Sequence, residues 1–275
     1  MKYLEIPIEV NGSVEDARLE TYILDTPTEK IMIKRRPMVV ICPGGGYEKL
    51  SFREGEPVAM QFLARGYHAC VLRYSVAPAR YPVPLLELGQ VMRILRSHAA
   101  EWLIDTDKIF VSGASAGAHL AGMLGVFWNQ GWLADMLETT GDVLKPAGLL
   151  LSYPVITSQE GKGHLPSFRN LLGEEFEAKR GELSLETQVT ADTPPVFLWH
   201  TAVDQTVPAV NSLLMAQALM EKKVPVELHI YPEGVHGLSL GTEQVRRADG
   251  TGVNEASRSW MELACDWIRR MCEEK

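Results

Sequence analysis

The chain has 275 residues, of which 46% are hydrophobic and 23% charged, and its formal net charge is −8 at pH 7. A chain of this length buries roughly 75% of its unfolded surface, so it needs neither disulfides nor a structural metal to fold. The acidic balance argues against nucleic-acid and anionic-membrane surfaces, because both attract a basic face. We expect a globular protein with no nucleic-acid or membrane partner.

The cysteines show neither C-x-x-C spacing nor a nearby histidine cluster, so they predict no disulfide frame and no metal site. They are Cys42, Cys70, Cys265 and Cys272. The first residues run straight into a strand pattern rather than a signal peptide, and no apolar run approaches the ~20 residues of a membrane span. These features predict a cytoplasmic location.

Alternating apolar and polar residues predict two N-terminal strands that have one wet face. Further short runs, most of them continuously apolar, predict strands that are covered on both faces. The first two lie at 3–10 and 18–24, and the others at 37–42, 67–72, 108–112, 147–153, 195–200 and 226–231.

Helical patterns fall between these strands, so the chain predicts a mostly parallel, doubly wound α/β sheet in a single domain, 1–275. The expected helices lie at 55–65, 85–102, 116–128, 209–222 and 254–271. Right-handed crossovers place the loops after the strands along one rim, where such sheets bind ligands. Residues 157–192 interrupt the alternation of predicted strands and helices. We interpret them as a lid inserted over the site, with a plain surface loop as the alternative.

The sequence Gly113-Ala114-Ser115-Ala116-Gly117 lies between a predicted strand and a predicted helix. Strand, G-x-S-x-G and helix together form the context of a nucleophile elbow, in which a strained turn lifts the serine hydroxyl clear of the sheet. The pattern alone is weak, because small residues cluster by chance in a chain with 23 glycines.

Three further features follow predicted strands and therefore fall on the same rim as Ser115. Asp204 comes after the strand at 195–200, and His236 comes after the last strand. The chain order Ser, Asp, His is the one expected for this type of elbow. The triplet Gly44–Gly46 would let backbone N–H groups approach a bound carbonyl oxygen, and with the N–H of Ala116 it would form an oxyanion hole.

Each feature also has a structural interpretation: Asp204 could cap a helix, His236 could be a hydrogen-bonded structural histidine, and the glycines could form a turn. All of these features lie on one rim, and the chain order is Ser, Asp, His, so we favour the interpretation that they form a catalytic site. Glu233 is an alternative orienting acid for His236, although Asp204 has the better strand–loop–helix context.

Other side chains near the rim carry weaker signals. We interpret His119 and His200 as core histidines. Four aromatic residues at strand ends would either line the substrate pocket or pack at the rim. They are Tyr47, Tyr74, Tyr153 and Trp199.

The chain resembles the acetyl-esterase/lipase-like group of the α/β-hydrolase superfamily, which contains small intracellular carboxylesterases, some acting on acetylated sugars or xylan fragments. The matching pieces are Cys-Pro-Gly-Gly-Gly-Tyr at 42–47, Gly-Ala-Ser-Ala-Gly-Ala-His-Leu-Ala at 113–121, Asp-Gln-Thr-Val-Pro at 204–208 and Gly-Val-His-Gly at 234–237. Two positions depart from the pattern. Pro43 replaces a common histidine, and Val203 replaces a common acidic residue.

The resemblance implies Ser115, Asp204 and His236 as a catalytic triad, and Gly45 and Gly46 as the oxyanion donors of the glycine loop, with the choice against Gly44 open. It implies hydrolysis of short-chain, mainly acetyl, esters of small molecules, with no cofactor or metal. The alternatives are an amide hydrolase such as an arylformamidase or small peptidase, and a non-catalytic binding protein. A homodimer is the default expectation for such enzymes.

Overall fold

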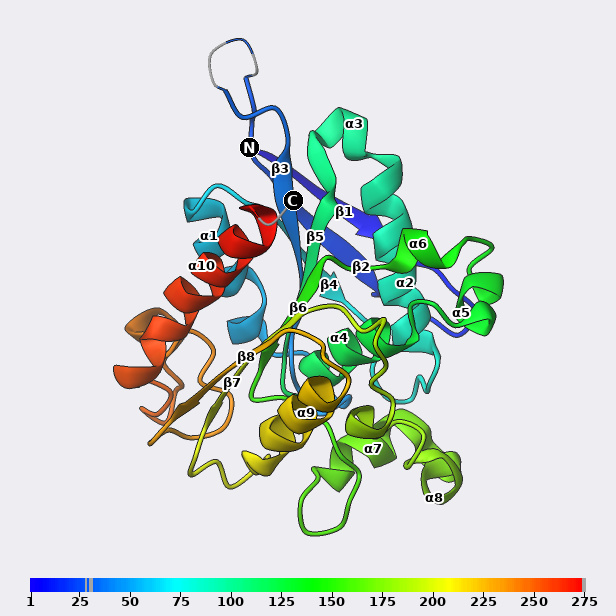
Figure 1. Ribbon diagram of the computed structural model, residues 1–275, viewed down its shortest axis with the longest axis vertical. Helices are drawn as coiled ribbons and strands as arrows, with labels where there is room; N and C mark the ends of the chain where they lie inside the picture. Colours follow the sequence, from blue (N-terminus) through cyan, green and yellow to red (C-terminus); the bar gives the residue numbers. More distant parts are fainter. Residues whose placement is uncertain (28, 30–31, 274–275) are drawn as a thin grey trace.

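The computed structural model describes residues 1–27, 29 and 32–273, which form an eight-stranded sheet (Figure 1). The strand order is β1-β2-β4-β3-β5-β6-β7-β8. β2 runs antiparallel to both β1 and β4, and all the other neighbouring strands are parallel. The bounds are β1 Lys2–Pro7, β2 Arg18–Ile23, β3 Arg36–Cys42, β4 His68–Arg73, β5 Ile104–Ala114, β6 Gly148–Ser152, β7 Val196–Thr201 and β8 Val226–Tyr231. The predicted mostly parallel α/β sheet is confirmed.

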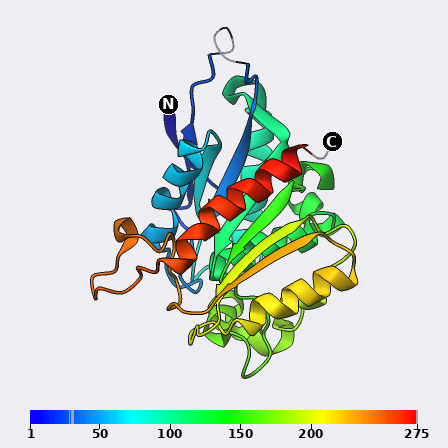
Figure 2. The same cartoon turned by 60° about the vertical axis from the view of Figure 1, so that its left-hand side comes forward.

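Helices cover both faces of the sheet: α1 and α10 pack on one face, and α2, α4 and α9 pack on the other (Figure 2). The longer helices are α1 Glu56–Ala64, α2 Val83–Ser97, α4 Ala116–Phe127, α9 Val210–Glu221 and α10 Trp260–Glu273. The shorter ones are α3 Ala99–Trp102, α5 Gly131–Met136, α6 Gly141–Leu144, α7 Leu165–Leu172 and α8 Phe176–Lys179. No helix in the described part of the chain is long and apolar enough to cross a membrane.

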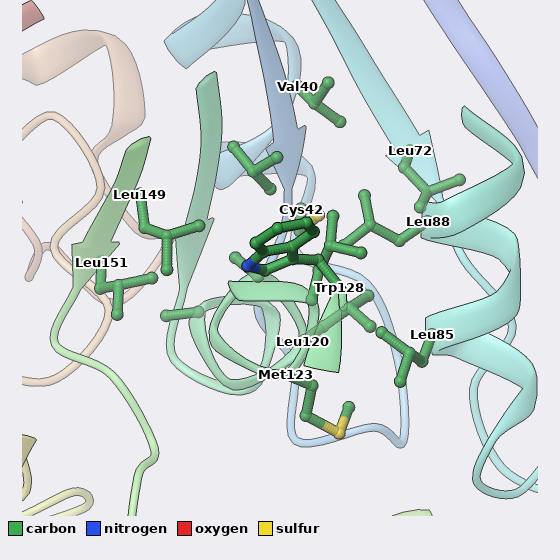
Figure 3. Close-up of a cluster of buried hydrophobic side chains, with 14 of the residues drawn as sticks. Val40, Cys42, Leu72, Leu85, Leu88, Leu120, Met123, Trp128, Leu149 and Leu151 are labelled. Carbon is green, nitrogen blue, oxygen red and sulfur yellow. The ribbon is translucent and has the colours of Figure 1, made fainter. Parts of the chain in front are cut away.

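The two helical layers explain why the central strands are continuously apolar. In β3, Met38 and Val40 belong to the core under α2 and α4, whereas Val39 and Ile41 belong to the core under α1 and α10. Successive side chains of a strand point to opposite faces, so a strand covered twice must be apolar at every position. Figure 3 shows part of the first core, where Leu120 of α4 lies among leucines of β6 and α2.

The bounds of two expected helices differ from the prediction. The helix predicted at 85–102 divides at His98 into α2 and α3. At this point the Ile94 carbonyl accepts both the His98 N–H at 3.0 Å and the Ser97 hydroxyl at 2.9 Å. The helix predicted from 254 begins at Trp260, after the 3-10 turn Ala256–Ser259.

The segment 157–192 contains α7, α8 and two 3-10 turns rather than a plain loop. It is anchored to the rest of the molecule: Phe168, Leu171 and Leu185 are buried in the core under α4, and the Leu183 carbonyl accepts a 2.8 Å hydrogen bond from His119 Nε2. Because α7 also reaches the loop at 44–46, this segment forms one wall of the site described next.

Candidate active site

Ser115 occupies a sharp turn between the end of β5 and the start of α4. Its backbone has φ 54° and ψ −118°, a conformation that is strained for a residue with a side chain. Glycines on both sides make the turn possible. A Cβ on Gly113 would lie 2.2 Å from the Gly117 carbonyl oxygen, and a Cβ on Gly117 would lie 2.1 Å from that of Cys42. The turn therefore has the geometry that the G-x-S-x-G pattern predicts.

The structure brings Ser115, His236 and Asp204 into one hydrogen-bonded row. The Ser115 hydroxyl lies 2.8 Å from His236 Nε2, and His236 Nδ1 lies 2.7 Å from Asp204 Oδ2. The Asp204 side chain is fully buried, whereas that of His236 is 17% exposed. This is the arrangement in which an imidazole can take a proton from the serine while the carboxylate holds its other nitrogen.

Asp204 is held by three hydrogen bonds and by one longer contact, with His200. Its Oδ1 accepts hydrogen bonds from the backbone N–H groups of Thr206 and Val207 at 2.9 and 3.0 Å, and its Oδ2 lies 2.7 Å from His236 Nδ1 and 3.4 Å from His200 Nε2. Burial raises the pKa of this carboxyl group, but the contacts with His200, His236 and the Val207 N–H outweigh burial and hold the pKa well below its usual value. Asp204 is therefore ionised at neutral pH.

Glu233, the alternative orienting acid, is exposed and makes no side-chain contact with His236. His200 is fully buried, and its ring nitrogens bind the Ser212 hydroxyl and the Val207 carbonyl, as expected for a core histidine. Its third contact, with Asp204 at 3.4 Å, places it closer to the site than its strand position indicates. His119 is also buried, with its pKa lowered by burial to about 4, and it bonds to Tyr47.

The glycine loop lies directly beside the nucleophile. The Gly44 N–H donates a 3.0 Å hydrogen bond to Glu54 Oε2, so this group is occupied. Gly45 and Gly46 have φ values of 133° and 68°, which favour glycine, and their N–H groups have no partner among the described residues. Ala116 begins α4, and the first N–H groups of a helix have no intrahelical acceptor.

A cleft of about 310 Å³ contains Ser115 and His236. Its walls come from the glycine loop, from His164 of the 157–192 segment, and from Thr206, Gly237 and Arg247. The segment after the glycine loop adds Glu48, Lys49, Ser51, Arg53 and Glu54. Burial, and then the nearby His236, lowers the pKa of His164. A second cavity of about 410 Å³ shares Thr206, His236 and Arg247 with this cleft and adds Val203, Gln205, Gly234 and Val235. Cavities of about 500 and 690 Å³ elsewhere contain none of the predicted site residues.

The aromatic residues at the strand ends pack behind the cleft instead of lining it. Tyr74 donates a 2.7 Å hydrogen bond to the Pro43 carbonyl, and Trp199 donates one of equal length to Ser152 Oγ. The ring of Tyr153 meets that of His236 edge-on, with 5.2 Å between the centroids. Of the two interpretations that the sequence left open, packing is the one observed.

Sequence reasoning missed three side chains. Arg53 and Arg247 donate to the carbonyls of Gly237 and His236, and so fasten the histidine loop. Glu54 is buried between the glycine loop and Tyr153. All three lie in polar stretches that read as solvated surface, so no periodicity or motif distinguished them. No group of three or more His, Cys, Asp or Glu side chains in the described ranges could hold a metal ion.

Comparison with known proteins identifies the family. The BD-FAE family pattern matches residues 24–219, most of the chain. The chain belongs to the BD-FAE family. A shorter match, to the prolyl oligopeptidase family, covers residues 172–270.

Solved structures resemble this BD-FAE chain over almost its whole length. An acetyl ester-xyloside bifunctional hydrolase from Caldicellulosiruptor lactoaceticus is 33% identical, with a TM-score of 0.82 over 98% of this chain and 96% of that one. A carboxylesterase from Lactobacillus plantarum is 25% identical, with a TM-score of 0.83 over 99% and 98%. The expected resemblance to acetyl-esterase-like α/β hydrolases is confirmed.

Curated relatives of this BD-FAE chain include two larger proteins. Endo-1,4-beta-xylanase B of Butyrivibrio fibrisolvens is 38% identical over 77% of this chain, and the acetylxylan esterase of Xylanibacter ruminicola is 29% identical over 74%. The chain spans only 34% and 41% of the lengths of these two proteins.

Proposed function

We propose that the protein hydrolyses short-chain acyl esters, acetyl esters above all, with Ser115, His236 and Asp204 as its catalytic triad. The observation that carries this proposal is the row of hydrogen bonds from the Ser115 hydroxyl through His236 to the ionised Asp204. The second line of support is the strained turn at Ser115, which presents the hydroxyl at the cleft.

In the proposed mechanism His236 Nε2 takes the proton from Ser115 as its Oγ forms a bond to the ester carbonyl carbon. Asp204 holds the imidazole in the tautomer that leaves Nε2 free to accept, and it stabilises the imidazolium. When the carbon–oxygen bond to the alcohol breaks, His236 returns the proton to the leaving oxygen. Water, activated by the same histidine, then releases the acid from the acyl-enzyme.

The oxyanion hole is assigned to the N–H groups of Gly45, Gly46 and Ala116. The occupation of the Gly44 N–H by Glu54 supports this choice among the glycines, because a donor already engaged cannot serve a developing oxyanion. The position of Ala116 at the start of α4 adds the positive end of a helix dipole.

For the substrate we propose an acetylated sugar such as an acetylated xylo-oligosaccharide. The names of the relatives above support this class, and so do the two adjoining cavities. The leaving alcohol must lie near His236, which protonates it, so we assign it to the cavity of about 410 Å³. There, exposed Val203 and Val235 offer apolar contacts to a sugar ring, and Gln205 and Arg247 offer donors to its hydroxyls.

The test is steady-state hydrolysis of p-nitrophenyl esters from acetate to octanoate, beside acetate release from acetylated xylo-oligosaccharides, for the wild type and Ser115→Ala. We expect turnover to fall steeply beyond butyrate, and acetate to be released from the sugars by the wild type alone. Absence of turnover on every ester would refute the proposal. In that case N-formylkynurenine and a short peptide would test the amide-hydrolase alternative, which the prolyl oligopeptidase overlap favours.

Three further expectations accompany this function. The free cysteines support a cytoplasmic location, since no described pair is bridged. A single cooperative unfolding transition would support one domain, 1–275. Light scattering after gel filtration would test the homodimer.

A further inference from the structure

Glu54 is a buried carboxylate that the proposed reaction does not use. It ends the 3-10 turn Phe52–Glu54, and it is only 5% exposed. Its Oε2 accepts the N–H of Gly44 at 3.0 Å, and its Oε1 accepts the hydroxyl of Tyr153 at 2.7 Å. Within the described ranges it forms no salt bridge. Because burying a polar group is costly unless hydrogen bonds satisfy it, these two hydrogen bonds hold the side chain in place.

The first of these hydrogen bonds fixes the start of the glycine loop. Gly44 lies tightly against the nucleophile, since a Cβ there would be 2.7 Å from the Ala114 carbonyl oxygen and 3.0 Å from Ser115 Cβ. Peptide units are planar, so this bond orients the Pro43–Gly44 unit. The next unit, which carries the Gly45 N–H, is held at the Gly44 carbonyl by the Ser51 N–H at 2.8 Å. The loop is thus fixed on both sides of Gly44, just before Gly45 and Gly46. Their free N–H groups are the proposed oxyanion donors.

The second hydrogen bond fixes the histidine side of the site. The Tyr153 hydroxyl donates to Glu54 and accepts the N–H of Ser239 at 2.9 Å. The Tyr153 ring meets the His236 imidazole edge-on, at an interplanar angle of 74°. The Ser239 hydroxyl in turn donates to the Arg53 carbonyl, next to Glu54 in the chain. One carboxylate thus links the glycine loop, the end of β6 and the histidine loop.

We propose that Glu54 is a positioning residue that holds the oxyanion donors and the imidazole of His236 in a common geometry around Ser115. It touches none of the reacting atoms and acts only through Gly44 and Tyr153. The inference rests on the proposed function, because it assigns Glu54 a part in the alignment of that machinery.

The test is Glu54→Gln, which keeps the size of the side chain but replaces one acceptor oxygen with an NH₂ donor. That donor must face either the N–H of Gly44 or the hydroxyl of Tyr153. We expect kcat for p-nitrophenyl acetate to fall about 10- to 100-fold, since a misplacement near 1 Å or a misaimed oxyanion donor costs rates of this order. KM should change less than about twofold. Tyr153→Phe should lower kcat in the same way, and the double variant should fall by less than the product of the two single effects.

Glu87 provides a matched control. It is fully buried, and its side chain also accepts a backbone N–H, that of Ser75 at 2.7 Å, and hydroxyls, those of Ser13 at 2.7 Å and of Ser75. It contacts no residue of the site. Glu87→Gln should change Tm by an amount comparable to Glu54→Gln, while kcat stays within about twofold of the wild type.

Labelling of Ser115 by a fluorophosphonate probe separates the possible failures, since it requires no ester turnover. If the wild type is labelled and Glu54→Gln is labelled equally fast, the role of Glu54 is overturned while the triad stands. If the wild type is neither labelled nor active on esters, the proposed function fails first. A kcat for Glu54→Gln equal to that of Glu87→Gln, or independent effects of Glu54→Gln and Tyr153→Phe, would also overturn the inference. If Glu54→Gln does not fold, Tyr153→Phe alone carries the test.

Discussion

Replacement of Asp204 by asparagine tests the role of the buried carboxylate without changing its shape. Two backbone N–H groups, from Thr206 and Val207, point at Oδ1. In Asp204→Asn the amide oxygen must stay on these two donors, because turning the NH₂ toward them would leave two buried N–H groups unpaired at about 1–3 kcal/mol each. The NH₂ therefore faces His236 Nδ1.

That orientation forces the wrong tautomer on the histidine. With a donor in front of it, Nδ1 must accept, so the hydrogen moves to Nε2, which can then no longer take the proton of Ser115. In a Ser-His-Asp triad the same change lowers kcat about 10⁴-fold, which corresponds to about 5.4 kcal/mol of transition-state stabilisation. We expect a loss of this size for p-nitrophenyl acetate at pH 7.5.

The assay pairs kcat/KM with thermal unfolding, and Asp266→Asn, an exposed position on α10, is the control. The folded-state pKa of Asp204 is depressed, so its contribution to stability is complete above the unfolded value near 4 and is lost as the pH falls through the folded value. The Tm difference between wild type and Asp204→Asn should therefore shrink below about pH 4. Retention of more than about a tenth of the activity at pH 7.5 would refute the tautomer argument.

Three other substitutions have clear expected results. Ser115→Ala should abolish acyl-enzyme formation, seen as loss of the mass shift after fluorophosphonate treatment; turnover at the wild-type level would remove Ser115 from the mechanism. Gly117→Ala would place a Cβ 2.1 Å from the Cys42 carbonyl oxygen and should lower the free energy of unfolding in urea by about 3 kcal/mol or more, whereas Gly131→Ala, with open space around it, should be tolerated. Burial lowers the pKa of His119 from 6.5 to about 4, so this histidine is neutral in the folded protein above pH 4 but takes up a proton below pH 6.5 when the protein is unfolded. The free energy of unfolding should therefore fall by up to about 1.4 kcal/mol per pH unit between pH 6.5 and pH 4. His119→Gln should show a shallower decline over that range.

The sheet was predictable because a strand that is buried on both faces has apolar residues at successive positions of the sequence. Strands such as β3 and β7 are apolar at nearly every position, and each lies within a residue or two of its predicted bounds. Element ends were less predictable, because they depend on single side chains. At the division at His98 the apolar periodicity continues into the next turn, so the pattern gives no sign of the boundary.

The placement of Ser115, Asp204 and His236 could be predicted for a topological reason. Each follows a strand of a parallel sheet, so the sheet alone brings the three loops to one edge, whatever the intervening residues do. The catalytic roles stay a prediction until the substitutions above are measured. The choice among the three glycines was not predictable, because it depends on which N–H is already engaged, and Gly44 is engaged by a residue ten positions away.

Glu54 shows why supporting residues escape sequence reasoning. A nucleophile or base is recognisable because its chemistry restricts the residue type and the fold restricts its place. A positioning carboxylate needs only to reach its donors, so it can come from any nearby segment, and here it comes from a 3-10 turn that reads as solvated surface. Its partner Tyr153 follows a buried strand, where an aromatic residue has packing as its ordinary explanation. What indicates a role in aligning the site is the set of hydrogen bonds that joins Glu54 to Tyr153 and to Gly44, and Tyr153 to Ser239. These bonds form only when the end of β6, the glycine loop and the histidine loop are brought together by the fold.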